Sequence, residues 1–362
     1  MAFFQALGGS SRAGRVLGPA LDKIIKNAAW RKHSNLVAAC KAALDHLDGL
    51  ADSPDLDDTS PLLGLPSAAA DSLLQPLVIA IDSGSPKVAE PALECSQKLF
   101  SHGLLRGEIN LQTDADDAPR SAASRLLASV CSCGGIGDEA IELAMLRVLI
   151  AAVRSPTVLV RDECLAQIVR SCYNVYLGSQ SGANQLCAKL VLAQMLVIIY
   201  ARVEADAMDV IRVRTVSIAD MMDLSDRNLN DSTLVQAAQN FINEVMEGNE
   251  AEPLPSKSHK GEGFVSTESS EGEGAVNGGL SKIREDGLFL FKNLCKLSMK
   301  FSTQENPEDP LLLRGKVLSL ELLKLAIENA GPLWRTNERQ VFLGPVLPSV
   351  FSTFFFQCLI SC

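Results

Sequence analysis

Histidine and cysteine are the residue types of this chain best suited to metal or redox chemistry, but their spacing assembles no such site. Cys131 and Cys133 lie too close together for a Cys-x-x-Cys pair. Three other cysteines fall among apolar residues in helical patterns, as expected of core thiols, namely Cys164, Cys172 and Cys187. The histidines are scattered without the spacing of metal ligands, at His33, His46, His102 and His259. We therefore predict no metal.

The motifs of enzymes are also missing. No G-x-x-x-x-G-K-[ST] sequence is present to hold a nucleotide phosphate. The segment Gly178-Ser179-Gln180-Ser181-Gly182 resembles a nucleophile elbow, but its central residue is glutamine where that motif needs serine. Acidic pairs such as Asp162-Glu163 and Glu285-Asp286 are typical of solvated helix ends. The sequence thus predicts neither an enzyme nor a cofactor, and contacts between helix faces become the chemistry to look for.

One stretch, Cys172–Tyr200, offers polar residues for such contacts. Its second half is apolar on every side, as in a helix buried in a core. Gly178 suits a left-handed helix end, and Ser181 suits the cap of the next helix. We predict two helices joined by a short polar turn. The polar candidates for contacts within the fold or with a partner are Asn174, Gln180, Asn184 and Gln185. A purely structural core role is the alternative.

A second candidate surface is basic. The first 50 residues carry more basic than acidic side chains, although the whole chain has a net charge of −10. A basic face on an acidic protein can meet an anionic membrane or an acidic partner. The alternative is an ordinary solvated helix face. The candidate residues are Lys23, Lys26, Arg31 and Lys32.

Composition argues against several other classes of protein. The negative net charge argues against broad nucleic-acid binding. The 10 cysteines follow no signal peptide and form no tight framework, which is typical of a reduced cytosolic protein. The apolar run from Leu186 to Ala201 is short for a membrane span and contains Lys189 and Gln194.

The elements that must position these residues are predicted to be helices. Helical periodicity recurs along the chain and period-two alternation is rare, which favours an all-α, armadillo- or HEAT-like α-solenoid. We expect Gly18-Pro19 to end an opening loop. Ser85-Pro86 and Ser155-Pro156 each carry the Ser-then-Pro signal that begins a helix. A further helix is expected over residues 205–224.

Composition changes sharply in two later segments. Residues 248–279 are rich in Gly, Ser and Glu, and we expect a disordered acidic linker with serines open to phosphorylation, or a plain spacer. Residues 340–362 carry no charge and are mostly apolar. A truncated or alternatively spliced product is the simplest interpretation. A membrane-anchoring tail is the alternative, because 23 residues can span a bilayer. Gly344, Pro345 and Pro348 argue against a regular spanning helix.

Five long strings of this sequence carry a resemblance. They are LDKIIKNAAWRKHSNL (21–36), CYNVYLGSQSGANQLCAKLVLAQM (172–195), NLNDSTLVQAAQNFINEVM (228–246), IREDGLFLFKNLCKLSMKFSTQENPEDP (283–310) and LLRGKVLSLELLKLAIENAGPLW (312–334). In these strings and their order, the chain resembles the amino-terminal region of the large brefeldin A-inhibited guanine-nucleotide exchange factors for ARF GTPases, above all the plant members.

The resemblance implies a domain plan. Residues 1–247 would be a dimerisation and cyclophilin-binding domain of armadillo type, and 280–339 the start of the domain upstream of the catalytic module. The implied partners are a second copy or the full-length factor, a cyclophilin-like protein and ARF-class GTPases. The implied place is the cytosol and, peripherally, trans-Golgi or endosomal membranes.

The matched strings stop before the catalytic module and before the Asn-aromatic-Asp-Cys box of the upstream domain. No residue of this chain therefore receives a catalytic role, and we expect no nucleotide exchange from it alone. Residues 340–362 remain unmatched. The resemblance implies a regulatory interaction region, with a tail-anchored membrane adaptor as the alternative.

Overall fold

The computed structural model describes residues 8–29, 31–52, 60–109, 121–208, 215–218, 221, 231–247, 282–300 and 310–329. Their elements are, in order, α1 (Arg12–Asn27), α2 (Ser34–Asp48), α3 (Ser67–Asp82), α4 (Pro86–Ser101), β1 (Gly107–Ile109), α5 (Ala122–Ser132), the 3-10 helix η1 (Cys133–Ile136), α6 (Glu139–Arg154), β2 (Val158–Val160), α7 (Asp162–Gly178), α8 (Gly182–Met208), α9 (Ser232–Glu247), α10 (Lys282–Lys300) and α11 (Pro310–Asn329).

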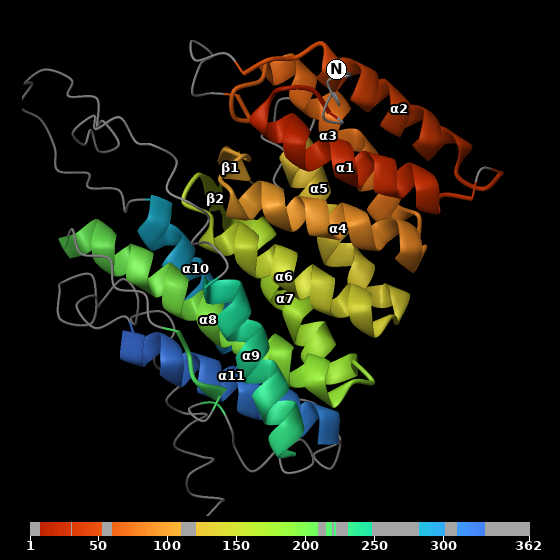
Figure 1. Ribbon diagram of the computed structural model, residues 1–362. Helices are drawn as coiled ribbons and strands as arrows, with labels where there is room; N and C mark the ends of the chain where they lie inside the picture. Colours follow the sequence, from red (N-terminus) through yellow and green to blue (C-terminus); the bar gives the residue numbers. More distant parts are fainter. Residues whose placement is uncertain are drawn as a thin grey trace, which may run out of the picture.

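The helices stack in sequence order, from α1–α3 at one end to α8–α11 at the other (Figure 1). Some helices pack against their neighbours in the chain, such as α2 on α3 and α7 on α8, and others pack against helices two or three places further along, such as α1 on α4, α4 on α6 and α6 on α8. One continuous apolar core runs from Leu17 on α1 to Leu322 on α11. The prediction of an all-α solenoid is confirmed.

Several helices begin where short polar side chains cap the first turn. Ser11 Oγ accepts a hydrogen bond from Gly14 N at 3.0 Å, which caps α1. Asp138 Oδ1 accepts from Ala140 N and Ile141 N at the start of α6. Such caps satisfy amide groups that have no partner inside the helix. Just before α6, Gly137 adopts φ 74°, a left-handed conformation that suits glycine.

Two expectations about where helices begin, both based on proline residues, are wrong. Helix α1 begins at Arg12 and continues through Gly18-Pro19, which we expected to end an opening loop. Pro19 removes a single helical hydrogen bond and lies on the exposed side of the helix. By contrast, Pro86 does begin α4, as predicted.

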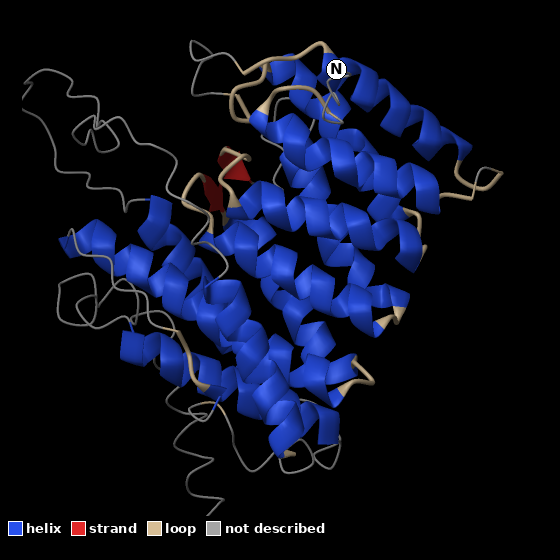
Figure 2. Cartoon of the chain, viewed as in Figure 1, coloured by secondary structure: helices blue, strands red, loops and turns tan. Residues whose placement is uncertain are grey.

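Ser155-Pro156 precedes strand β2 instead of a helix, and α7 begins only at Asp162. The apolar residues of β2 pair in parallel with β1, with Val158 opposite Gly107 and Val160 opposite Ile109. This small ribbon lies at one side of the helical stack (Figure 2). The strand was missed because three residues are too few for alternation to be recognised.

Two local expectations near α8 are also corrected. Gly178 ends α7, but its φ is not positive, and Ser179 follows in an extended conformation. Within the described residues, the helix expected over 205–224 is present as the end of α8 up to Met208, whereas residues 215–217 are not helical. Side chains hold this segment, because the Val216 amide donates to Gln194 Oε1 at 2.7 Å.

Helix α8 is the central element of the fold. It packs against α6, α7, α9, α10 and α11, and Tyr200 on it is fully buried. Its stretch Gly182–Glu204 is long and apolar enough to cross a membrane, but 94% of the most apolar window is buried inside the protein. The prediction of a buried helix after a short polar turn is confirmed. The expected linker 248–279 and tail 340–362 lie outside the described residues.

Candidate interaction surfaces

The polar turn between α7 and α8 is fastened to α6 through a buried carboxylate. Glu142 Oε2 accepts hydrogen bonds from Ser179 Oγ at 2.6 Å and from Asn184 Nδ2 at 2.8 Å. Asn184 also donates to the backbone oxygen of Glu139 at 3.0 Å. All three bonds connect α6 to the turn before α8 or to the start of α8, so Asn184 makes its contacts within the fold. A buried carboxylate requires such donors, because burial without them is strongly unfavourable.

Gln185 connects the same turn to α11. Its Nε2 donates to the Ser179 carbonyl at 2.7 Å, and its Oε1 accepts from Arg314 Nη2 at 2.8 Å. The Arg314 guanidinium lies 4.7 Å from the centre of the Tyr176 ring, within the range of a cation–π contact. Gln185 is therefore half-buried at the junction of three helices.

The four polar candidates thus divide into two pairs. Asn184 and Gln185 make contacts within the solenoid, whereas Asn174 and Gln180 are exposed. The exposed pair is therefore the better candidate for contact with a partner. Their role in binding stays a prediction.

The basic residues of the first helices are partly neutralised. Lys23 Nζ lies 3.0 Å from Glu94 Oε2 on α4, and Lys26 Nζ lies 2.6 Å from Asp22 Oδ2. These pairs are exposed and contribute little to stability. Arg31 and Lys32, in the turn before α2, are exposed. The strongest cationic part of the predicted basic face is therefore this turn.

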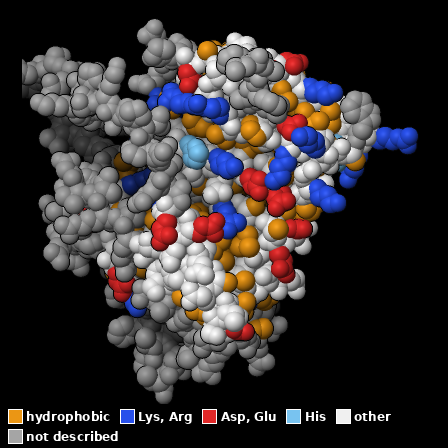
Figure 3. Space-filling view, in the orientation of Figure 1, with side chains coloured by type: hydrophobic (Ala, Val, Ile, Leu, Met, Phe, Trp, Pro, Cys, Tyr) orange, Lys and Arg blue, Asp and Glu red, His pale blue; other side chains and the backbone are white. Residues whose placement is uncertain are grey.

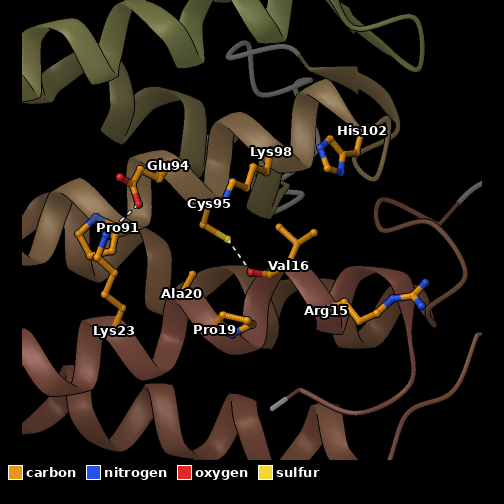
Figure 4. Close-up of a pocket in the computed structure, with 10 residues that line it drawn as sticks. All are labelled: Arg15, Val16, Pro19, Ala20, Lys23, Pro91, Glu94, Cys95, Lys98 and His102. Carbon is orange, nitrogen blue, oxygen red and sulfur yellow. Dashed lines mark hydrogen bonds and ion pairs between the residues drawn. The ribbon is translucent and has the colours of Figure 1, made fainter. Parts of the chain in front are cut away.

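A groove lies between α1 and α4, with a cavity volume of about 480 Å³ (Figure 4). Its lining is Arg15, Val16, Pro19, Ala20, Lys23, Pro91, Glu94, Cys95, Lys98 and His102. Lys23 is the one lining residue that the sequence offered as an interaction candidate. The others were missed because α1 and α4 are separated by two further helices in the chain, and only packing brings them together.

Helices α10 and α11 join the solenoid through polar contacts that sequence analysis also missed. Arg161 Nε lies 3.0 Å from Asp286 Oδ2, and both side chains are buried. Burial raises the pKa of Asp286, and the hydrogen bond from Arg161 opposes this shift. Lys189, the single charge in the apolar run of α8, pairs with Glu321 on α11 at 2.9 Å. An isolated lysine in an apolar helix is the one sequence signal of this junction.

A tyrosine makes a further contact at this junction. Tyr173 OH lies 2.6 Å from Ser319 Oγ and also bonds the Gly315 carbonyl. Burial raises the pKa of this phenol, so it remains a neutral donor. The contact places α7 directly on α11.

The thiols are core residues. Eight cysteines are free and buried in the described residues. Burial raises the pKa of Cys95 to about 12, which makes the reactive thiolate scarce at neutral pH. Among the described residues, no group of three or more His, Cys, Asp or Glu side chains could hold a metal ion.

Comparison with known proteins identifies the class of this helical stack. Residues 10–207 match the Mon2/Sec7/BIG1-like dimerisation and cyclophilin-binding domain. Residues 283–345 match the HUS domain of the same group. The chain belongs to the Mon2/Sec7/BIG1-like family, and the resemblance found in the sequence is confirmed.

Three individual relatives show how similar the chain is to known members of the family. The chain is 52% identical to brefeldin A-inhibited guanine nucleotide-exchange protein 1 of Arabidopsis thaliana, over 99% of this chain and 21% of the relative. It is 44% identical to protein 4 of the same plant, over 99% of this chain and 22% of the relative. The human protein 1 is 25% identical over 91% of this chain and 26% of the relative. The chain thus spans about a fifth of the length of its plant relatives.

The matches also extend past Arg339. The HUS match continues to residue 345, and the plant alignments cover 99% of the chain. Part of the segment 340–362, for which the sequence strings gave no match, is therefore aligned with these relatives.

Proposed function

We propose that this chain is the regulatory, self-associating region of an ARF guanine-nucleotide exchange factor. It acts by helix-face contacts in vesicle trafficking at trans-Golgi and endosomal membranes, and exchange itself belongs to the longer protein. The observation that carries the proposal is the match of residues 10–207 to a dimerisation and cyclophilin-binding domain. The plant relatives are named as brefeldin A-inhibited guanine nucleotide-exchange proteins, which supports the exchange-factor context.

The packing of α10 and α11 supports a scaffold role. The HUS match begins at residue 283, just inside α10. Both helices pack on α8, and their apolar residues belong to the same core as the preceding helices. Two domains that share one core can present exposed residues to the same partner.

Sedimentation velocity of the purified chain tests self-association directly. We expect a concentration-dependent dimer that is weakened about tenfold by the double variant Asn174→Glu/Gln180→Glu, because paired negative charges at an interface repel. Asn35→Glu, on the exposed side of α2, is the matched control and leaves the dimer unchanged. A strictly monomeric chain up to 100 micromolar would contradict the proposal.

A nucleotide-release assay with a fluorescent nucleotide on an ARF GTPase tests the absence of exchange. We expect the chain alone to leave the release rate at its uncatalysed value. A clear acceleration would overturn this part of the proposal.

Recruitment to membranes has its own test. Flotation with phosphatidylserine-containing vesicles should recover the chain, and Arg31→Glu/Lys32→Glu should reduce recovery several-fold because each basic residue near an anionic surface contributes roughly 1 kcal/mol. Lys87→Glu is the control for charge. Equal recovery of both variants would remove the basic turn from the proposal.

A further inference from the structure

The groove between α1 and α4 combines an apolar floor with a cationic end. Val16, Pro19 and Ala20 from α1 face Pro91 and Cys95 from α4 across its base (Figure 4). In the upper part of the space-filling view, where α1 and α4 lie, basic side chains border a patch of hydrophobic surface (Figure 3). The two helices thus supply both apolar contact area and charge to one concave surface.

Contacts between the helices fix the groove in shape. Cys95 Sγ donates to the Val16 carbonyl at 3.8 Å, directly across the floor. Pro91 has no amide hydrogen, so the Lys87 carbonyl lacks its usual helical donor. Asn27 Nδ2 on α1 supplies that donor at 2.8 Å. The floor is therefore preformed, and a ligand need not order it.

The basic side chains at the two ends of the groove differ in whether they have an ion-pair partner. At one end Lys23 pairs with Glu94. At the other end Arg15, Lys98 and His102 are exposed, and within the described part of the chain none of them has a carboxylate partner. Arg15 and Lys98 are cations without a carboxylate partner among the described residues, and they border an apolar floor. Such a surface complements a ligand that carries carboxylates next to an apolar side chain.

We propose that this groove binds an acidic segment of a partner protein that carries an apolar anchor residue. The anchor packs between Val16, Pro19 and Pro91, and carboxylates on one side of it meet Arg15 and Lys98. This inference goes beyond self-association and membrane recruitment, since it identifies a binding site and the chemistry of its ligand. It stands independently of both.

The dimensions set the length and direction of the ligand. Arg15 and Lys23 are eight residues apart on α1, which corresponds to about 12 Å at the rise of an α-helix. That length accommodates roughly two helical turns or four extended residues. The carboxylates must lie toward the Arg15 end, because Glu94 occupies the other end. A flat membrane surface reaches the rim but not this concave floor.

Fluorescence anisotropy with a defined probe tests the site. The probe is a fluorescein-labelled dodecapeptide with four consecutive glutamates followed by a leucine and a phenylalanine, and glutamine replaces glutamate in the control peptide. We expect the acidic probe to bind the full chain and Lys98→Glu to weaken binding at least tenfold. Ala20→Glu should weaken it similarly by placing a charge on the floor. Lys87→Glu, the same charge change on α4 outside the groove, should leave binding unchanged.

Each other result overturns the proposal. Equal binding of both peptides would mean that the groove selects only apolar side chains. Equal affinity of Lys98→Glu and Lys87→Glu would place the probe elsewhere. Loss of self-association in Lys98→Glu without loss of probe binding would make a second copy the occupant. A carbodiimide cross-link from Lys98 to a glutamate of the same chain outside α4, formed at high dilution, would make the occupant intramolecular.

Discussion

Arg161 Nε lies 3.0 Å from Asp286 Oδ2, which ties the segment before α7 to the first turns of α10 across 125 positions of sequence. The Asp162 amide donates to the other carboxylate oxygen at 3.3 Å, and Asp162 itself adopts φ 44°. A left-handed conformation is unusual for a residue other than glycine. The carboxylate of Asp286 therefore neutralises a buried guanidinium. It also accepts a hydrogen bond from a residue in an unusual backbone conformation.

Replacement of Asp286 by alanine should destabilise the protein strongly. It leaves the buried Arg161 without its nearest carboxylate, and removal of one partner of a buried ion pair costs about 3 kcal/mol of unfolding free energy. Urea denaturation followed by circular dichroism measures this loss. The double variant Arg161→Met/Asp286→Leu should recover most of it, because an apolar pair has no charge to desolvate.

Glu285→Gln provides the control for this ion pair. Glu285 Oε2 lies 3.3 Å from the same guanidinium, but its side chain is 53% exposed. We expect a loss below roughly 1 kcal/mol, as for other exposed pairs. Similar losses for Glu285→Gln and Asp286→Ala would show that burial does not decide the contribution.

The contact between Asn184 and Glu142 predicts that a buried and an exposed asparagine differ in their contribution to stability. Asn184→Leu removes a donor from a buried carboxylate and should cost about 2 kcal/mol, the magnitude of an unsatisfied buried polar group. Asn174→Leu, on the exposed side of α7, should change stability by less than roughly 0.5 kcal/mol. Thermal unfolding of the two variants in parallel tests the difference. If Asn184→Leu unfolds with the wild type, the network around Glu142 has no structural role.

Close packing of α10 on α8 predicts that Gly287 tolerates no branched side chain. A Cβ atom there would lie 2.9 Å from Val203 Cγ2, and the Gly287 carbonyl accepts a hydrogen bond from Tyr200 OH at 3.2 Å. Gly287→Val should separate the two helices and cost about 2 kcal/mol, in the range of overpacked cores. Limited proteolysis should then cleave near α10 first. Unchanged proteolysis and stability would contradict this close approach.

Buried thiols predict a loss of stability in alkali. Desolvation raises the pKa of Cys95 from 9.0 to about 12 in the folded protein, and Cys40 and Cys187 shift alike. The unfolded chain therefore ionises first as the pH rises. The contribution of these thiols to stability is complete below pH 9 and is lost between about pH 9 and 12.

Two measurements check the behaviour of the thiols. The free energy of unfolding should fall from pH 9 upward, and a Cys40→Ala/Cys187→Ala variant should show a shallower fall. At pH 8, native protein should react with a disulfide reagent at least a hundredfold more slowly than unfolded protein, because thiolate is the reactive form. Cys358→Ser/Cys362→Ser removes the two cysteines outside the described residues from this comparison. Rapid modification of the native variant would mean that the thiols are accessible.

The sequence by itself determined the helical class, the buried helix after the polar turn, the core thiols and the family. Helical periodicity is local, so the apolar residues of α8 predict its burial without knowledge of its neighbours. The matched strings are long and ordered, so they identify the family without a structure. Proline and glycine were less informative, because Pro19 is tolerated inside a helix and Pro156 leads into a strand.

Only the tertiary structure decided which polar residues meet. Asn184 and Gln180 are alike in type and lie in the same turn, yet one is buried against Glu142 and the other is exposed. Packing between elements remote in sequence pairs Arg161 with Asp286. It also brings Arg15 and Lys98 to the same groove. Local patterns specify which face of a helix is apolar. The partner of a polar side chain depends on how whole helices stack, and that is a property of the complete core.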